Sequence, residues 1–216
     1  MNDQAALREE MVKTGRLLVR KGLVKGTGGN ISVRTARGFL VTPSGMDYDL
    51  LTADDIVEMD LCGRVLSGER TPSIENRMHL AVLAVRNDVN AVVHVHSTFA
   101  TAFACARREL DVSNDNQSAV FGGPVAVAAY APIGTQELAD NVVKALGNEG
   151  LGVLLSNHGS LCVGGSVAEA LFRCEMLEEF AKVALLSQVI GGAVSLTDEQ
   201  ARSEAEDLKT RYGQKT

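Results

Sequence analysis

Two apolar runs that each lead into a histidine motif constrain the fold of this chain more than any other feature. The first run contains His94 and His96 in a His-Val-His step, and the second, residues 151–155, is followed by His158. Alternate side chains leave a strand on the same side, so His94 and His96 would project together, roughly 7 Å apart. A strand end nearby can deliver His158 to the same point. Three neutral imidazoles with an open fourth position are typical of a catalytic Zn²⁺ site.

A carboxylate upstream supports this interpretation. Glu75 lies on a predicted helix that begins near Pro72, just before the first histidine strand, where it could reach the metal or a substrate. Taken singly, a strand histidine is more often a half-buried residue satisfied by one hydrogen bond. A glutamate at a helix start is likewise favoured by capping and by the helix dipole. His79, four residues after Glu75, is within reach of that carboxylate but is predicted to be structural.

Composition narrows the class of partner. A chain of 216 residues can bury one sizeable α/β core, and we expect a single domain over residues 1–216. The net charge is −6 and basic residues do not cluster, which argues against nucleic acid. Without a signal-like N-terminus or a run of membrane-spanning length, the sequence predicts a soluble, cytoplasmic protein with no membrane partner. The scattered cysteines are expected to be reduced and mostly buried: Cys62, Cys105, Cys162 and Cys174.

Hydrophobic periodicity alternates between helical and strand-like segments, which is typical of an α/β protein. Strands are expected at residues 31–33, 38–41, 56–59, 91–96, 125–129 and 151–155. Helices are expected at residues 3–22, 73–86, 98–107, 135–146, from 166 onward, and 197–213.

Two glycine-bearing loops adjoin the first strands. Residues 26–30 are Gly-Thr-Gly-Gly-Asn, and residues 42–45 are Thr-Pro-Ser-Gly. Such loops expose backbone N–H groups and hydroxyls that can bind phosphate. They lack the Gly-Lys-Ser/Thr ending of a P-loop, and the order of helix, glycines and strand reverses the dinucleotide fingerprint. Taken alone, the loops are therefore interpreted as turns.

Five motifs, taken together and in order, resemble those of the class II aldolase family, which includes L-fuculose-1-phosphate aldolase and L-ribulose-5-phosphate 4-epimerase. The resemblance covers nearly the whole chain and is closest to the aldolase branch. The motifs are Gly28-Gly29-Asn30-Ile31-Ser32, Thr42-Pro43-Ser44-Gly45, Pro72-Ser73-Ile74-Glu75, His94-Val95-His96-Ser97 and Asn157-His158-Gly159.

The resemblance implies an α/β/α domain with a central, mostly antiparallel sheet flanked by helices. The alternation of helices and strands alone would have suggested a parallel sheet. The resemblance also implies a homotetramer with active sites between subunits and a mobile C-terminal tail from about residue 209.

The resemblance further assigns roles to individual residues. His94, His96 and His158 match the divalent-metal ligands, with Zn²⁺ expected and Mn²⁺ or Co²⁺ possible. Glu75 resembles the catalytic acid/base, which can also touch the metal when substrate is absent. Tyr212 resembles a second catalytic residue, the C-terminal tyrosine that reaches the site from the tail. The expected phosphate-binding positions are Asn30, Ser44, Gly45 and Ser73.

Two departures from the aldolase pattern affect substrate binding. Ile74 stands where L-fuculose-1-phosphate aldolase has a second serine, so one hydroxyl for the phosphate is missing. The loop at residues 113–117 is Ser-Asn-Asp-Asn-Gln and lacks the tyrosine that the aldolase contributes there. A polar side chain or water would then protonate the leaving alkoxide.

The implied reaction is reversible cleavage of a short ketose 1-phosphate, similar to L-fuculose 1-phosphate, to dihydroxyacetone phosphate and an aldehyde. No lysine is arranged for a Schiff base. The related 4-epimerases carry aspartate in place of Glu75, and the sugar-acid phosphate decarboxylases resemble Thr-Lys-Glu where this chain has Ser-Ile-Glu. Ile74 leaves open an unphosphorylated substrate. An adducin-like binding module is a further alternative, but it lacks the metal-binding residues.

Overall fold

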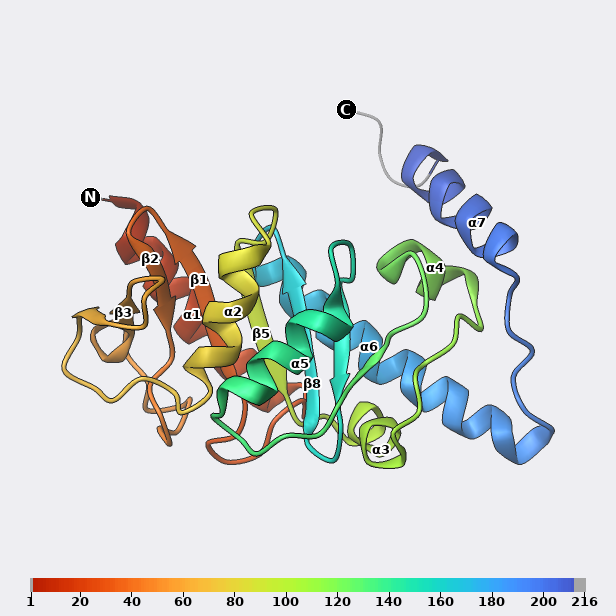
Figure 1. Ribbon diagram of the computed structural model, residues 1–216, viewed down its shortest axis with the longest axis horizontal. Coiled ribbons are helices and arrows are strands. Elements are labelled where there is room, and N and C mark those ends of the chain that lie inside the picture. The colour runs from red at the N-terminus through yellow and green to blue at the C-terminus, as the bar shows by residue number, and fades with distance from the viewer. Residues whose placement is uncertain (1, 212–216) are drawn as a thin grey trace.

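The strands join into one sheet in the order β4-β3-β2-β1-β5-β8-β7-β6 in the computed structural model, which describes residues 2–211 (Figure 1). Neighbouring strands are antiparallel except for the parallel pair β6 and β7. The mostly antiparallel sheet implied by the resemblance is therefore confirmed. The strands are β1 (Asn30–Thr35), β2 (Gly38–Val41), β3 (Val57–Met59), β4 (Val65–Ser67), β5 (Ala91–Val95), β6 (Val127–Ala128), β7 (Gly152–Leu155) and β8 (Gly159–Gly164).

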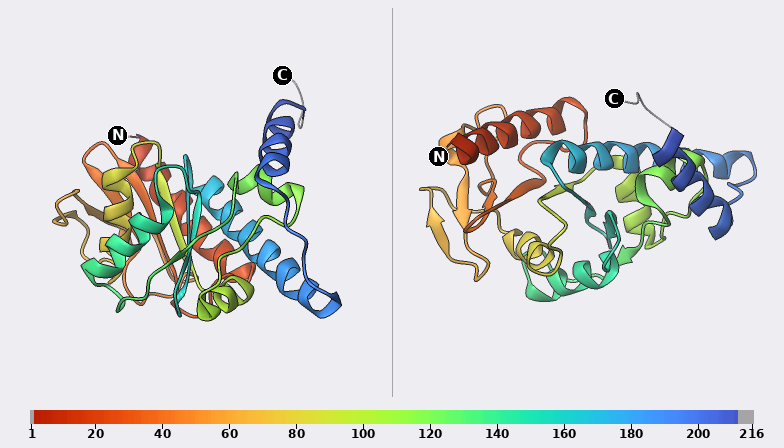
Figure 2. Two further views of the ribbon diagram at one scale, coloured as in Figure 1. Left: turned by 45° about the vertical axis from the view of Figure 1, so that its right-hand side comes forward. Right: turned by 90° about the horizontal axis from the view of Figure 1, so that it is seen from above.

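Helices cover both faces of this sheet, as the view from above in Figure 2 shows. On one face lie α1 (Asn2–Arg20) and α6 (Val167–Ser187), and on the other α2 (Asn76–Val85) and α5 (Gln136–Leu146). Toward the β6 side, α3 (Thr98–Ala106) packs on α6, and α4 (Asp115–Phe121) packs on α7 (Asp198–Arg211). Two short 3₁₀ turns complete the description, Ala53–Asp55 and Gln188–Ile190.

The pleat of β5 divides its side chains between two hydrophobic clusters. Val93 and Val95 belong to the cluster under α1 and α6, whereas Val92 belongs to the cluster under α2 and α5. Because side chains alternate along a strand, His94 shares the α2 face with Val92. In β1, Ile31 packs toward α1, which places Asn30 and Ser32 on the same face as His94. The polar residues of two neighbouring strands thus face the helix that follows Glu75.

The expected helices and strands are present, with differences at their boundaries. The helix expected from residue 73 begins at Asn76, so Glu75 precedes it, and β5 ends at Val95, so His96 follows the strand. The sequence reasoning missed β4, α4 and β8. In β8, glycines at both ends resemble loop composition, and the strand forms only because it pairs with β5 and β7.

The cysteines were expected to be reduced and mostly buried, and only half of them are buried. All four cysteines are free, and Cys162 and Cys174 are buried, but Cys62 and Cys105 are exposed. Cys62 lies in a turn and Cys105 on the outer side of α3, where neither is needed for the core. In the described part of the chain, none of the helices is both long enough and apolar enough to cross a membrane.

Candidate metal centre

Three imidazoles and one carboxylate converge where β5 ends and the turn between β7 and β8 begins. The Nε2 atom of His96 lies 2.9 Å from Nε2 of His94 and 3.2 Å from Nε2 of His158. Glu75 places Oε2 3.3 Å from Nε2 of His94 and Oε1 3.4 Å from Nε2 of His158. The four ligand atoms all lie within 4.8 Å of one another. The structure therefore brings together the four residues that the sequence proposed as metal ligands.

His94 is oriented by the neighbouring strand. Its ring is fully buried, and its Nδ1 lies 2.8 Å from the backbone carbonyl oxygen of Ser160 in β8. A carbonyl oxygen only accepts, so Nδ1 carries the hydrogen, and in the neutral tautomer Nε2 has the lone pair that can bind a metal. A hydrogen bond of this kind fixes both tautomer and ring orientation in metal sites.

Two glycines make room for His96. A Cβ atom on Gly28 would lie 2.9 Å from Nδ1 of His96, and one on Gly159 would lie 2.8 Å from its Cδ2 and 2.4 Å from the carbonyl oxygen of Val95. Side chains at either position would collide with the ring or the backbone. The glycine of the first loop, interpreted from sequence as a turn residue, is thus also part of the wall of the site.

The turn between β7 and β8 presents His158. Asn157 adopts a left-handed conformation with φ of 58°, which asparagine tolerates better than most residues. Its side-chain oxygen accepts a hydrogen bond of 3.0 Å from Nε of Arg107, at the end of α3. The backbone N–H of His158 donates to the carbonyl oxygen of Leu155 at 2.9 Å. The turn is therefore held from two sides.

Glu75 contributes a buried carboxylate with one unsatisfied oxygen. Its Oε2 accepts a hydrogen bond of 2.8 Å from Nδ2 of Asn30, whereas Oε1 is buried and has no hydrogen-bond partner. Burial disfavours the charged carboxylate, but His94, His158 and the Asn30 hydrogen bond outweigh it and hold the pKa of Glu75 well below its usual range. A buried, ionised oxygen without a donor is a position that a cation would satisfy.

The two more accessible imidazoles are neutral near pH 7. Burial lowers the pKa of both His96 and His158 to about 4, and the neighbouring His94 ring acts in the same direction. Neutral imidazole is the form that binds metal. Three such nitrogens and one carboxylate oxygen form a donor set suited to Zn²⁺ and similar divalent ions. The residues present therefore fit a divalent metal ion.

Three of the four expected phosphate-binding residues lie on two adjacent segments, one of which leads into Glu75. The N–H of Ser44 donates to the carbonyl of Thr71 at 2.9 Å, and the N–H of Ser73 donates to the carbonyl of Thr42 at 3.0 Å. Ser44 and the following Gly45 are exposed, whereas Ser73 is buried and its Oγ accepts from the N–H of Glu75 at 3.2 Å.

The remaining expected residues of the site lie differently. Asn30 is buried, and both ends of its amide are hydrogen-bonded inside the protein. Ile74 is 62 % exposed and offers no hydroxyl. Tyr212, the expected tail residue, lies outside the described residues.

The chain is similar in sequence and fold to known proteins. Residues 9–185 match the model of the family described as "Class II Aldolase and Adducin N-terminal domain". The chain is 36 % identical to L-fuculose phosphate aldolase of Escherichia coli (strain K12) over 208 residues, which cover 96 % of this chain and 95 % of the relative. It is also 36 % identical to 5-deoxy-D-ribulose 1-phosphate aldolase of Bacillus thuringiensis serovar kurstaki over 210 residues, or 96 % and 97 % of the two chains.

A solved structure described as L-fuculose 1-phosphate aldolase superposes with a TM-score of 0.91 at 41 % identity, and the match covers 94 % of this chain and 96 % of the other. Together with the histidine and glutamate cluster, these similarities show an enzyme, a class II aldolase that acts as a carbon–carbon lyase. The chain belongs to the Class II Aldolase and Adducin N-terminal domain family.

Proposed function

We propose that the protein reversibly cleaves a short ketose 1-phosphate, similar to L-fuculose 1-phosphate, to dihydroxyacetone phosphate and an aldehyde. The observation that carries this proposal is the convergence of three imidazole nitrogens with the Glu75 carboxylate, one oxygen of which has no hydrogen-bond partner. Relatives with the same overall length are named as aldolases of two ketose 1-phosphates, which supports this class of substrate.

The four converging residues would hold a divalent ion, for which we propose Zn²⁺, with Mn²⁺ or Co²⁺ as alternatives. When bound, such an ion supplies Lewis-acid stabilisation of the negative charge that develops on the substrate oxygens as the carbon–carbon bond breaks. Glu75 itself would serve as a ligand only until substrate arrives, after which its carboxylate is available for proton transfer.

In the direction of synthesis, the Glu75 carboxylate accepts a proton from the carbon of dihydroxyacetone phosphate that becomes the nucleophile. The electron pair left on that carbon attacks the aldehyde carbon, and the aldehyde oxygen gains a proton from a neighbouring acid. Tyr212 is proposed as that acid, with water as the alternative because the loop at 113–117 lacks a tyrosine. Cleavage is the same sequence in reverse.

Phosphate binding is proposed for the hydroxyls of Ser44 and Ser73, the backbone at Gly45 and the second N–H of the Asn30 amide, which Glu75 does not accept. Exposed backbone next to a small hydroxyl, as at positions 44 and 45, suits a phosphate group. With isoleucine at position 74, the phosphate receives one hydroxyl fewer than in the aldolase pattern, so we expect weaker phosphate affinity rather than none.

A substrate panel tests the proposed function. We expect the metal-loaded protein to release dihydroxyacetone phosphate from L-fuculose 1-phosphate or 5-deoxy-D-ribulose 1-phosphate, and to act on the unphosphorylated ketoses at least about tenfold less efficiently, because a charge-assisted phosphate contact contributes more than 1 kcal/mol. The measurement is coupled detection of dihydroxyacetone phosphate, together with aldehyde detection for the unphosphorylated ketoses.

Each alternative function has its own outcome in this panel. Interconversion of pentulose 5-phosphates would identify an epimerase, and CO₂ release from a sugar-acid phosphate would identify a decarboxylase. Preferential cleavage of unphosphorylated ketoses would identify an aldolase of unphosphorylated substrates. Failure of every substrate with metal-loaded protein would contradict the aldolase proposal and favour a binding module.

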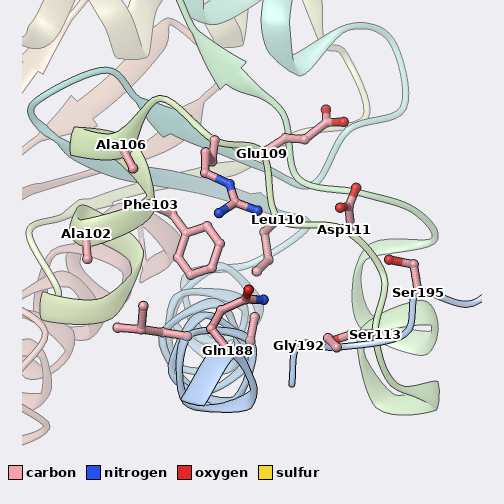
Figure 3. Close-up of a pocket in the computed structure, with 14 residues that line it drawn as sticks. Ala102, Phe103, Ala106, Glu109, Leu110, Asp111, Ser113, Gln188, Gly192 and Ser195 are labelled. Atoms are coloured by element: carbon pink, nitrogen blue, oxygen red, sulfur yellow. The ribbon is translucent and has the colours of Figure 1, made fainter. Parts of the chain in front are cut away.

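We also propose a homotetramer in which active sites lie between subunits. The end of α6 extends beyond the sheet (Figure 1). Exposed apolar side chains occur at this end of the helix and in the segment that follows, and such patches mark protein interfaces. They are Leu185, Leu186, Val189, Ile190 and Val194. A cavity of about 320 Å³ adjoins them, lined by residues such as Phe103, Leu110 and Gln188 (Figure 3).

A mass measurement tests the assembly. We expect light scattering to give the mass of four chains for the wild type, and a smaller assembly for the double variant Val189→Asp/Ile190→Asp, because two charges would be buried in an apolar contact. Both positions are more than 80 % exposed in the single chain, so the folded protomer should tolerate them. A wild-type protein with the mass of one chain would contradict the proposal.

A further inference from the structure

We propose that His79 and Ser32 are positioning residues that fix the orientation of the Asn30 amide, so that its N–H groups, and not its oxygen, face the Glu75 carboxylate. This inference rests on the proposed function, because it assigns a purpose to holding that carboxylate in one geometry. His79 was expected from sequence to be structural and within reach of Glu75. In the structure it contacts Asn30 instead.

The four side chains form one continuous hydrogen-bonded chain. Oγ of Ser32 lies 2.6 Å from Nδ1 of His79, and Nε2 of His79 lies 2.5 Å from Oδ1 of Asn30. Nδ2 of Asn30 then lies 2.8 Å from Oε2 of Glu75. All four residues are at most 5 % exposed, so no water competes for these groups from bulk solvent. This hydrogen-bonded network connects β1, α2 and the metal centre.

The donor and acceptor at each link follow from the chemistry of the groups. Oδ1 of an amide only accepts, so Nε2 of His79 must carry the hydrogen. Burial lowers the pKa of His79 to about 3, so the ring is neutral and its Nδ1 has a lone pair. That lone pair accepts the hydroxyl hydrogen of Ser32. Each of the four side chains therefore donates to the next, from Ser32 to Glu75.

This polarity matters because an asparagine amide can otherwise rotate by half a turn with little change in shape. In the rotated form, Oδ1 of Asn30 would face Oε2 of Glu75, and two acceptors would meet without a hydrogen between them. Glu75 would lose its one side-chain donor and move away from the observed position. The N–H of His79 selects against that form, since it requires an acceptor at the other end of the amide.

A double-mutant cycle separates this role from simple packing. We expect His79→Leu to lower kcat by about 10- to 100-fold, the range found for partners that orient functional side chains, with a smaller change in KM. His79→Gln, which keeps an N–H donor, should recover most of kcat. In an Asn30→Ala background, His79→Leu should change kcat by less than about twofold, because coupled residues are not additive.

A matched control tests whether a loss of stability alone could lower kcat. Val82, on the same helix and fully buried, has a side chain that can neither donate nor accept a hydrogen bond, so Val82→Ala should lower the melting temperature without changing kcat. If His79→Leu lowers kcat by the same factor with and without Asn30, or if Val82→Ala has the same effect as His79→Leu, His79 acts only through stability and the proposal is overturned. Should His79→Leu fail to fold, Ser32→Ala enters the same cycle.

A second measurement does not depend on activity. In ¹⁵N NMR spectra of histidine-labelled protein, we expect one ring with a protonated Nε2 and an unprotonated Nδ1 that keeps this tautomer from pH 8 to pH 5, and His79→Gln should remove its signals. A protonated Nδ1 in that ring would overturn the proposed role of His79 even if aldolase activity is found. The expected tautomer without any aldolase activity would support the role of His79 and contradict the proposed function instead.

Discussion

The variant His94→Ala is expected to purify with less than about one tenth of a metal ion per chain and to lose on the order of 10³-fold or more of kcat/KM, because both the ligand set and the Lewis acid depend on this ring. His94 is fully buried in the central strand and is held by Ser160, so no other side chain can take its place. Its removal would also take away the ring that contributes most to holding the pKa of Glu75 low.

Metal content by mass spectrometry and kinetics on the same preparation are the measurements. His79→Gln is the matched control for metal content, because it changes a buried histidine that contributes no atom to the cluster, and it should keep about as much metal as the wild type. Full metal content in His94→Ala would show that the imidazoles converge for a reason other than metal binding.

The variant Glu75→Gln is expected to lower kcat by about 10²- to 10⁴-fold, the range for loss of a general acid or base, while metal content remains because the three imidazoles are unchanged. Glutamine has the same shape and can still accept from Asn30, but its amide cannot take up a proton. The substitution should therefore slow proton transfer and leave metal binding unchanged.

Hydrogen exchange isolates this step. With dihydroxyacetone phosphate alone in D₂O, the wild type should exchange one hydrogen on the carbon that becomes the nucleophile, and Glu75→Gln should not, as followed by ¹H NMR. Glu137→Gln is the matched control, because Glu137 is also a glutamate at a helix start but is exposed and contributes no atom to the cluster. Unchanged exchange in Glu75→Gln would assign the proton transfer to another group.

The histidine positions on β5 could be predicted from sequence because a strand repeats every two residues. The His-Val-His step places His94 on one face and Val95 on the other, and the hydrophobic clusters confirm this division. Sequence could also predict that His158 lies near a strand end. The antiparallel direction came only from the family resemblance, because helices and strands that alternate are equally compatible with a parallel sheet.

The partners of Asn30 could not be predicted, because they depend on contacts between distant segments. Asn30 pairs with His94 in the β1–β5 register, and its amide meets a helix that begins more than forty residues later. Sequence reasoning placed Asn30 at the phosphate, and nothing local indicates that its side chain connects His79 to Glu75. The one signal available was a histidine, His79, four residues after the candidate acid.

The four candidate metal ligands come from both halves of the chain and meet at the paired ends of the central strands β5 and β8. An ion held by all four residues would therefore cross-link segments that are far apart in sequence. It would make local separation of β5 from β8 less favourable. In this protein, the ion needed for the reaction would also protect the fold against local unfolding and proteolysis.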